Sequence, residues 1–209
     1  MHHTISSLPD GSPFALIQNM YNESEHEEIM AELRYLYSRK NLWLDPENSG
    51  TAKDTSTNEN LKNNKCIWLN QIYKTLDASA ILTYNMKLYK SGFAKTLANE
   101  HPWFKYLVYN SEFTTLLSYY ENSEYYKAHR DRSVLTTLTW FYEEPKKFEG
   151  GNLILEDNAT VECINNAMLI IPSTTLHEVT PIILSENDLN QGLGRYTITT
   201  FVSITASQS

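Results

Sequence analysis

His129 and Asp131, in the segment YYKAHRD, are the residues whose types and spacing point most directly to chemistry. Side chains two positions apart lie on the same face of an extended strand. An imidazole and a carboxylate held in this way can occupy neighbouring positions around a first-row metal ion. The pair is a weak signal by itself, because most such tripeptides are surface residues or salt bridges.

His177, in PSTTLHEV, is the candidate for a third ligand. Only His129 and His177 of the six histidines stand in apolar, strand-like sequence. The other four lie at the N-terminus, in an acidic helical stretch or before a proline. Two histidines and one carboxylate would form the triad of non-haem Fe(II) enzymes. The alternative is that His177 only caps a strand end through a hydrogen bond.

Arg195 opens the strand-like run RYTITTFVSI and shares a strand face with Thr197. A guanidinium with a hydroxyl two residues further on can bind a carboxylate in fork geometry. An arginine at a strand start is more often solvated or salt-bridged. Arg195 and Thr197 therefore indicate a carboxylate site only in combination with the candidate metal ligands.

Composition narrows the class of protein. The formal net charge is −8, and no block of Lys or Arg is present, so strong non-specific nucleic-acid binding is not expected. Cys66 and Cys163 form no CxxC pair and indicate reduced thiols. No run approaches 18 apolar residues and no signal peptide is recognisable, which predicts a soluble cytoplasmic protein without a membrane partner.

The N-terminal part, residues 1–112, is predicted to be mainly helical. Ser24 and Glu27 have the capping-box form, and an apolar face follows at helical spacing. The polar segment 45–65 predicts a long mobile loop, either an idle insertion or a lid over a site. A second helical region is expected over about 78–98, with an interruption near Gly92.

Residues 113–209 change in character. Eight strand-like runs follow one another without helices, separated by turn-forming segments: FTTLLSYY, YYKAHRD, SVLTTLTWFYEE, NLILED, TVECI, AMLIIPS, LHEVTPII and RYTITTFVSI. They predict an α+β protein of one domain, in which N-terminal helices pack on one sheet of a jelly roll, that is, a double-stranded β-helix of about eight strands.

These elements together resemble the 2-oxoglutarate and Fe(II)-dependent oxygenases of the prolyl-4-hydroxylase-like group. The resemblance rests on Tyr120 and Tyr126, nine and three residues before His129, and on HRD, FEGGNLIL, IIPSTTLHEVTPI and GRYTITTFV. It covers nearly the whole chain, and the set is specific only when taken in order and spacing. The gap between His177 and Arg195 is longer than the family pattern because of an insertion at 184–194.

The resemblance implies that His129, Asp131 and His177 hold Fe(II) and that Arg195 anchors the 5-carboxylate of 2-oxoglutarate. Thr197 and Tyr120 would donate further hydrogen bonds to this co-substrate. Dioxygen would be the oxidant and ascorbate a candidate stimulant, with succinate and CO2 as products. Related halogenases have a small residue in place of the aspartate, so the carboxylate favours hydroxylation of an unactivated C–H bond.

Tyr126 and Trp140 are candidates for contact with substrate, although aromatic residues inside a barrel are more often core. The substrate could be a small molecule, a free amino acid or a short, including prolyl, peptide. A jelly-roll binding module of the cupin or lectin kind, without oxygenase activity, is the competing hypothesis. It would leave Arg195, Thr197 and Tyr120 without a common purpose. The sequence leaves the oligomeric state open.

Overall fold

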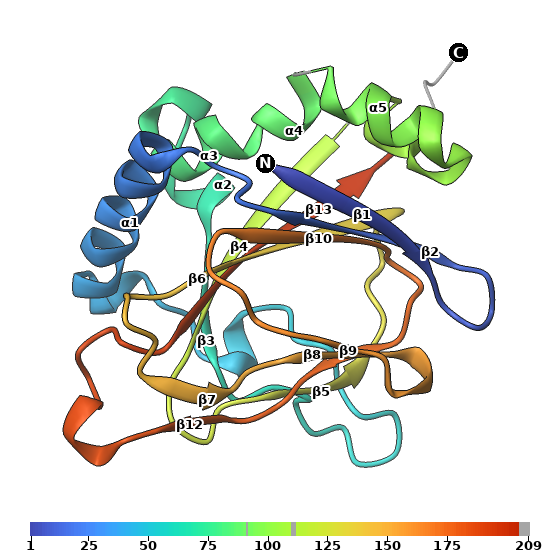
Figure 1. The fold of residues 1–209 in the computed structure, drawn as a ribbon. Helices are drawn as coiled ribbons and strands as arrows, with labels where there is room; N and C mark the ends of the chain where they lie inside the picture. The colour runs from blue at the N-terminus through green and yellow to red at the C-terminus, as the bar shows by residue number, and fades with distance from the viewer. Residues whose placement is uncertain (91, 110–111, 205–209) are drawn as a thin grey trace.

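The structure, a computed structural model, describes residues 1–90, 92–109 and 112–204. A large antiparallel sheet faces a smaller layer of strands, and the helices cover the outer face of the large sheet (Figure 1). The helices are α1 (Glu23–Ser38), α2 (Leu69–Ile72), α3 (Ala80–Asn85), α4 (Lys87–Lys90) and α5 (Phe93–Glu100). None of the helices in the described ranges is long and apolar enough to cross a membrane.

The large sheet contains seven strands among the described residues. Its order is β1 (His2–Ser7), β2 (Pro13–Gln18), β10 (Ala167–Pro172), β6 (Leu135–Phe141), β13 (Arg195–Ser203), β4 (Glu112–Tyr120) and β3 (Lys65–Trp68). The last strand of the chain, β13, therefore lies in the middle, hydrogen-bonded to β4 on one side and β6 on the other. This central position buries its first residue completely.

The smaller layer contains two short sheets. One has the order β5 (Tyr126–His129), β11 (His177–Val179), β8 (Leu153–Leu155) and β9 (Thr160–Val161), and the other pairs β12 (Ile182–Leu184) with β7 (Phe148–Gly150). With the facing large sheet, this arrangement is the predicted jelly roll. Pairing of β11 with β5 brings together two segments that are far apart in the sequence.

Side-chain alternation along the central strands divides the interior into two apolar clusters. Tyr196 and Ile198 of β13 face the helices, whereas Leu138 and Trp140 of β6 face the smaller layer. The expectation that Arg195 and Thr197 share the opposite face of β13 from Tyr196 agrees with this division. The polar side chains of that face consequently point into the space between the sheets.

Helix α1 carries the predicted apolar face, since Ile29, Met30 and Leu33 are buried. Its predicted start is wrong by two residues: Asn22, not Ser24, is the N-cap. The Asn22 side chain accepts from the Glu25 backbone N–H, and the Glu25 carboxylate accepts from the Asn22 N–H. Asn22 with Glu25 and Ser24 with Glu27 both have the capping-box spacing. Asparagine and serine cap helices equally well, so the sequence does not decide between the two pairs.

The N-terminal half is less helical than the sequence predicts. Strands β1, β2 and β3 extend both edges of the large sheet. Burial alternates along β2, where Ala15 and Ile17 face the core, but five of its six residues, PFALIQ, are apolar, so the sequence shows no period of two. The expected helix over 78–98 is divided into α3, α4 and α5, so it breaks near Met86 as well as near Gly92.

Two predicted features of the C-terminal half also need correction. LHEVTPII is not one strand but two, because β11 and β12 pair with different partners on either side of Pro181, which has no N–H to donate. The segment EEPKKFEGG is not only a turn, since Phe148–Gly150 forms β7. Three residues are too few to show a hydrophobic period in the sequence.

Candidate active site

The three predicted metal ligands lie together at one end of the smaller layer. His129 on β5 and His177 on β11 are direct cross-strand partners, and their ring centroids lie 4.3 Å apart. Asp131 follows β5, with Oδ1 3.8 Å from His129 Nε2 and Oδ2 3.7 Å from His177 Nε2. One ligand atom from each residue lies within 4.8 Å of the other two, so a single ion fits between them.

Hydrogen bonds orient both imidazoles. His129 Nδ1 lies 2.8 Å from the Lys127 carbonyl oxygen, and His177 Nδ1 lies 2.9 Å from that of Thr175. Since a carbonyl only accepts, each Nδ1 carries the proton and each Nε2 keeps its lone pair toward Asp131. Burial lowers the pKa of His129 to about 3, which keeps this ring neutral and ready to bind a metal.

Two further residues position Asp131, one through its carboxylate and one through its backbone. Thr136 on β6 donates to Asp131 Oδ2 over 2.7 Å, and its hydroxyl lies 2.9 Å from that of Ser173. The backbone N–H of Asp131 donates to the Ser173 carbonyl over 2.9 Å. No local sequence signal marks Thr136 for this role. Its position beside Ser173 depends on pairing between β6 and β10.

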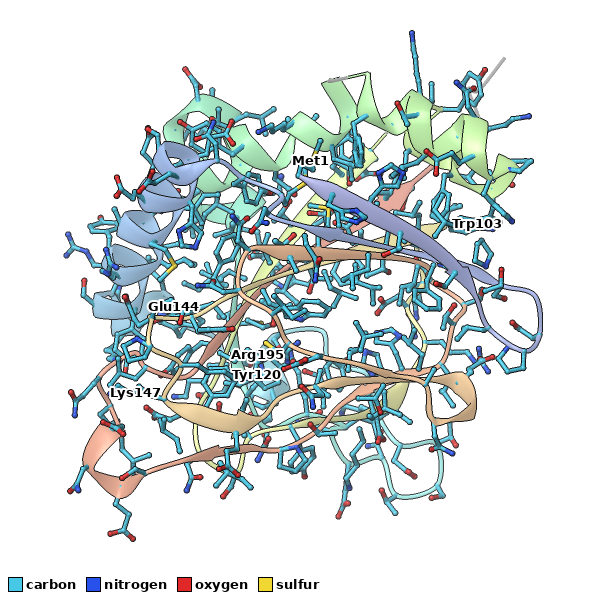
Figure 2. The ribbon with its side chains drawn as sticks, in the orientation of Figure 1. Met1, Trp103, Tyr120, Glu144, Lys147 and Arg195 are labelled. Atoms are coloured by element: carbon cyan, nitrogen blue, oxygen red, sulfur yellow. The ribbon has the colours of Figure 1, made fainter. Side chains whose placement is uncertain are left out.

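Arg195 is fully buried between the two layers. Its guanidinium lies 5.0 Å from the ring centroid of Tyr120 and 5.9 Å from that of Trp140, and Figure 2 shows Arg195 and Tyr120 side by side. None of the three guanidinium nitrogens has a hydrogen-bond partner among the described residues, and neither have Thr197 Oγ1 and Trp140 Nε1.

Such a group of unpaired donors would be costly to bury unless an anion completes it. The weak acceptor beside the guanidinium is the thiol of Cys163, whose pKa is raised by burial although the arginine opposes the shift. The donor set at Arg195 therefore fits a carboxylate ligand.

Gly151 does more than form the expected turn before the fourth predicted strand. Its φ is +67°, and a Cβ there would lie 3.1 Å from Arg195 Cδ and 2.3 Å from Ile182 Cδ1. A side chain at this position would displace the arginine. Gly151 thus positions Arg195, a role that the sequence motif FEGGNLIL did not reveal.

A cleft of about 800 Å³ opens over the candidate metal ligands. Tyr120, Tyr126 and Thr197 line it together with the triad, whereas Trp140 is fully buried and does not. The ring of Tyr126 stacks on that of His129 with centroids 3.6 Å apart and an interplanar angle of 10°. Of the two predicted substrate contacts, Tyr126 lies in the cleft and Trp140 lies against Arg195.

The predicted loop 45–65 contributes one wall of this cleft through residues 49–53 and Lys62. An antiparallel bridge joins Lys53 to Asn60, and a second joins Lys62 to Tyr126. The segment between the first pair is exposed. The loop therefore has the place that a lid requires, while its mobility stays a prediction.

The insertion at 184–194 leaves the register of β13 undisturbed. Asn190 N donates to Glu121 Oε1 over 2.7 Å, and Gly194 N donates to the Tyr119 hydroxyl over 3.1 Å. Arg195 then pairs directly with Tyr120. The extra residues form a tethered connection outside the cleft.

Residues 115–203 match the sequence model of the 2OG-Fe(II) oxygenase superfamily. A PKHD-type hydroxylase of Acinetobacter baumannii strain AYE is 35% identical over 82 residues, which cover 32% of this chain and 36% of that protein. A PKHD-type hydroxylase of Shewanella baltica is 27% identical over 84 residues, covering 34% and 38%. The chain thus spans about a third of the length of these curated relatives.

The fold is similar to those of solved prolyl hydroxylases. A Pseudomonas putida prolyl-4-hydroxylase superposes with a TM-score of 0.58 at 15% identity, covering 92% of this chain and 93% of that one. The viral collagen prolyl hydroxylase of Paramecium Bursaria Chlorella virus-1, described as a 2OG complex, gives 0.54 at 12% identity, covering 94% and 98%. The family resemblance seen in the sequence is confirmed over residues 115–203. The predicted triad of His129, Asp131 and His177 is a group that could hold a metal ion.

Proposed function

We propose that the protein hydroxylates an unactivated C–H bond, from the premise that residues 115–203 match the sequence model of the 2OG-Fe(II) oxygenase superfamily. The substrate would be a small molecule, an amino acid or a peptide that contains proline. The two classes of relatives, PKHD-type and prolyl hydroxylases, support hydroxylation as the reaction. The carboxylate of Asp131 fills the third ligand position, which supports the same choice.

His129, Asp131 and His177 would hold Fe(II) through two Nε2 atoms and one carboxylate oxygen. Each Nδ1 is hydrogen-bonded to a backbone carbonyl, which turns both Nε2 atoms toward Asp131, and Thr136 fixes the carboxylate. The donor set suits a first-row divalent ion and leaves other coordination positions free. These residues therefore fit the metal of the superfamily.

Arg195 would bind the 5-carboxylate of 2-oxoglutarate, with Thr197 and Tyr120 as further donors. The observation that carries this proposal is the set of unpaired donor atoms around the fully buried guanidinium. A charge-assisted, bidentate contact there would satisfy donors that otherwise stay unpaired. Trp140 Nε1 is a further unpaired donor in the same group.

When bound, Fe(II) and 2-oxoglutarate supply the oxidising power for C–H hydroxylation, with succinate and CO2 as products. The chain's own residues contribute position and the exclusion of water. The Tyr126 ring holds His129 by stacking and shields it from solvent. The loop wall beside the triad would close over the substrate.

The competing function is a binding module of the cupin or lectin kind. A bound metal alone would account for the triad, but it would leave Arg195 buried without an anion. Anaerobic titration of the Fe(II)-loaded protein with 2-oxoglutarate separates the two functions. An oxygenase should develop metal-to-ligand charge-transfer absorbance and then form succinate when air is admitted. A protein that binds Fe(II) but shows neither signal would be a binding module.

A further inference from the structure

Lys62 is a buried lysine in the wall of the cleft. It lies near the end of loop 45–65, where its backbone bridges to Tyr126 and the Leu61 carbonyl accepts from Lys127 N over 2.8 Å. Its side chain is 4% exposed. The ammonium lies 5.7 Å from the Tyr126 ring centroid, and Tyr126 in turn stacks on His129. A buried cation therefore lies close to the candidate metal ligands.

The ammonium of Lys62 has no anionic partner among the described residues. Two other lysines of the described residues are paired with carboxylates: Lys65 lies 3.1 Å from Asp45 and Lys87 lies 2.6 Å from Glu25. The polar contact of Lys62 is with the buried thiol of Cys66, whose Sγ is 3.6 Å away. Burial lowers the pKa of Lys62, and no carboxylate among the described residues supplies a compensating charge. A ligand anion would supply that charge.

The excess of positive charge in the whole cleft also favours an anionic ligand. Lys53, Lys62, Arg130 and Arg132 line it, against a single carboxylate, Asp131. Arg130 is neutralised by an ion pair with Glu156, which leaves three cations. This excess occurs in a protein whose formal net charge is −8. A positive cleft in an acidic protein attracts and selects anions.

The metal and 2-oxoglutarate of the proposed function would not neutralise the charge of Lys62. A divalent metal on Asp131 keeps one positive charge, and Arg195 adds another. The two carboxylates of 2-oxoglutarate balance both. Lys62 is then in surplus, and it comes from the covering loop, whereas Arg195 comes from the central strand of the large sheet.

We propose that Lys62 is a specificity-determining residue that binds a carboxylate of the primary substrate. The substrate class is therefore an anionic small molecule, such as a free amino acid or another carboxylic acid, rather than an internal prolyl residue of a neutral peptide. Arg132 and Lys53, both exposed at the same cleft, draw such an anion toward it. This inference rests on the proposed oxygenase function.

The first test uses iodide as an anion probe in crystals of the protein loaded with Mn(II) and 2-oxoglutarate. We expect anomalous density beside Lys62 Nζ in the parent and none in Lys62→Met. Methionine keeps most of the length of the side chain and removes a buried charge, so the fold should tolerate it. Absence of the ion from the parent, or its persistence in the variant, would overturn the proposal.

The second test separates the two carboxylate sites by 2-oxoglutarate titration. Lys62→Met and the control Lys65→Met, which removes an exposed lysine outside the cleft, should bind 2-oxoglutarate as the parent does. If Lys62→Met weakened it as strongly as Arg195→Met, Lys62 would belong to the co-substrate site and the proposal would be wrong. Failure of the parent itself to bind 2-oxoglutarate would instead refute the proposed function.

The third test compares free L-amino acids with their carboxamides as substrates, with succinate formation as the readout. Acids should be turned over in preference, and Lys62→Met should lose about 10- to 100-fold in kcat/KM for them, as expected for loss of a charge-assisted contact. Equal turnover of the acids by parent and variant, or an equal loss for acids and carboxamides, would contradict a role for Lys62 in carboxylate binding.

Discussion

The guanidinium of Arg195 lies 5.0 Å from the ring centroid of Tyr120, its direct cross-strand partner. The pair joins the first residue of β13 to the last residue of β4 in the middle of the large sheet. Gly151 leaves room for the arginine on the opposite side. The protein thus fixes a cation in an apolar interior while leaving its donor atoms unpaired, which is the arrangement that an anionic co-substrate requires.

Replacement of Arg195 should therefore weaken 2-oxoglutarate binding. Arg195→Met is expected to raise the Kd for 2-oxoglutarate by about 10- to 100-fold, since a charge-assisted contact contributes roughly 1.5–3 kcal/mol. Arg195→Lys should recover part of the loss because it keeps the charge but not the fork. The measurement is an anaerobic titration followed by charge-transfer absorbance. Unchanged 2-oxoglutarate affinity in the Met variant would place the carboxylate elsewhere.

His177→Ala should abolish Fe(II) binding while the fold is retained. The side chain lies at the end of a short strand, and its loss removes one of three ligands from a site that needs all of them. Metal content after equilibrium dialysis measures the loss of Fe(II) binding. Thermal melting of the metal-free protein measures whether the fold is retained. His2→Ala, at the exposed N-terminus, is the control. Normal iron content in His177→Ala would disprove its assignment as a ligand.

Thr136→Val tests whether the hydroxyl that holds Asp131 tunes the metal site. The change conserves volume and removes the donor to Asp131 Oδ2. Loss of such an orienting contact lowers metal affinity by about 10- to 100-fold in comparable sites. Thr139→Val makes the same change on the opposite face of β6 and should leave the affinity unchanged. Equal metal affinity in both variants and the parent would remove Thr136 from the site.

Glu124 should make stability depend on pH. Burial raises the pKa of its carboxyl to about 7, above the ordinary value of 4.5. The folded state then binds more protons than the unfolded state between these values, so stability is highest below pH 4.5 and falls as the pH rises through 7. Glu124→Gln, which keeps an acceptor for the Glu121 N–H, should melt at a higher temperature than the parent at pH 8. At pH 5 the difference should be much smaller.

The loop 45–65 should be cut first in limited proteolysis, between Thr55 and Glu59. This segment is exposed and lies beyond the bridge from Lys53 to Asn60, where short turns open most easily. A loop that closes over substrate should become protected only when metal, 2-oxoglutarate and substrate are all bound. Equal cleavage with and without these ligands would exclude the lid while leaving the mobility intact.

The site residues could be identified from the sequence because they stand at fixed spacings in strand-like runs, although Asp131 lies just beyond the end of β5. His129 and Asp131 are two residues apart, and Arg195 and Thr197 repeat that spacing on the last strand. The period of two fixes which side chains share a face, whatever the strand pairs with. The strand-like character of the C-terminal half was likewise visible, since its runs are apolar and separated by turn residues.

Short or edge elements were not visible in the same way. Strand β7 has three residues, and β1 and β2 lie at the margin of the sheet, so neither composition nor period marks them strongly. The division at Pro181 depends on which partner each half of the segment finds. Helix capping by Asn22 rather than Ser24 is a choice between two motifs of similar propensity.

The sequence by itself determined the chemistry that the chain can perform, because residue types and their local spacing set the donor atoms and the face on which they lie. Only the tertiary structure decided which of them meet. Cross-strand pairing places His177 beside His129, and β6 and β10 bring Thr136 and Ser173 to Asp131. Burial leaves Arg195 and Lys62 without anions. These relationships join residues distant in the chain, and packing against the sheets, not local propensity, selects them.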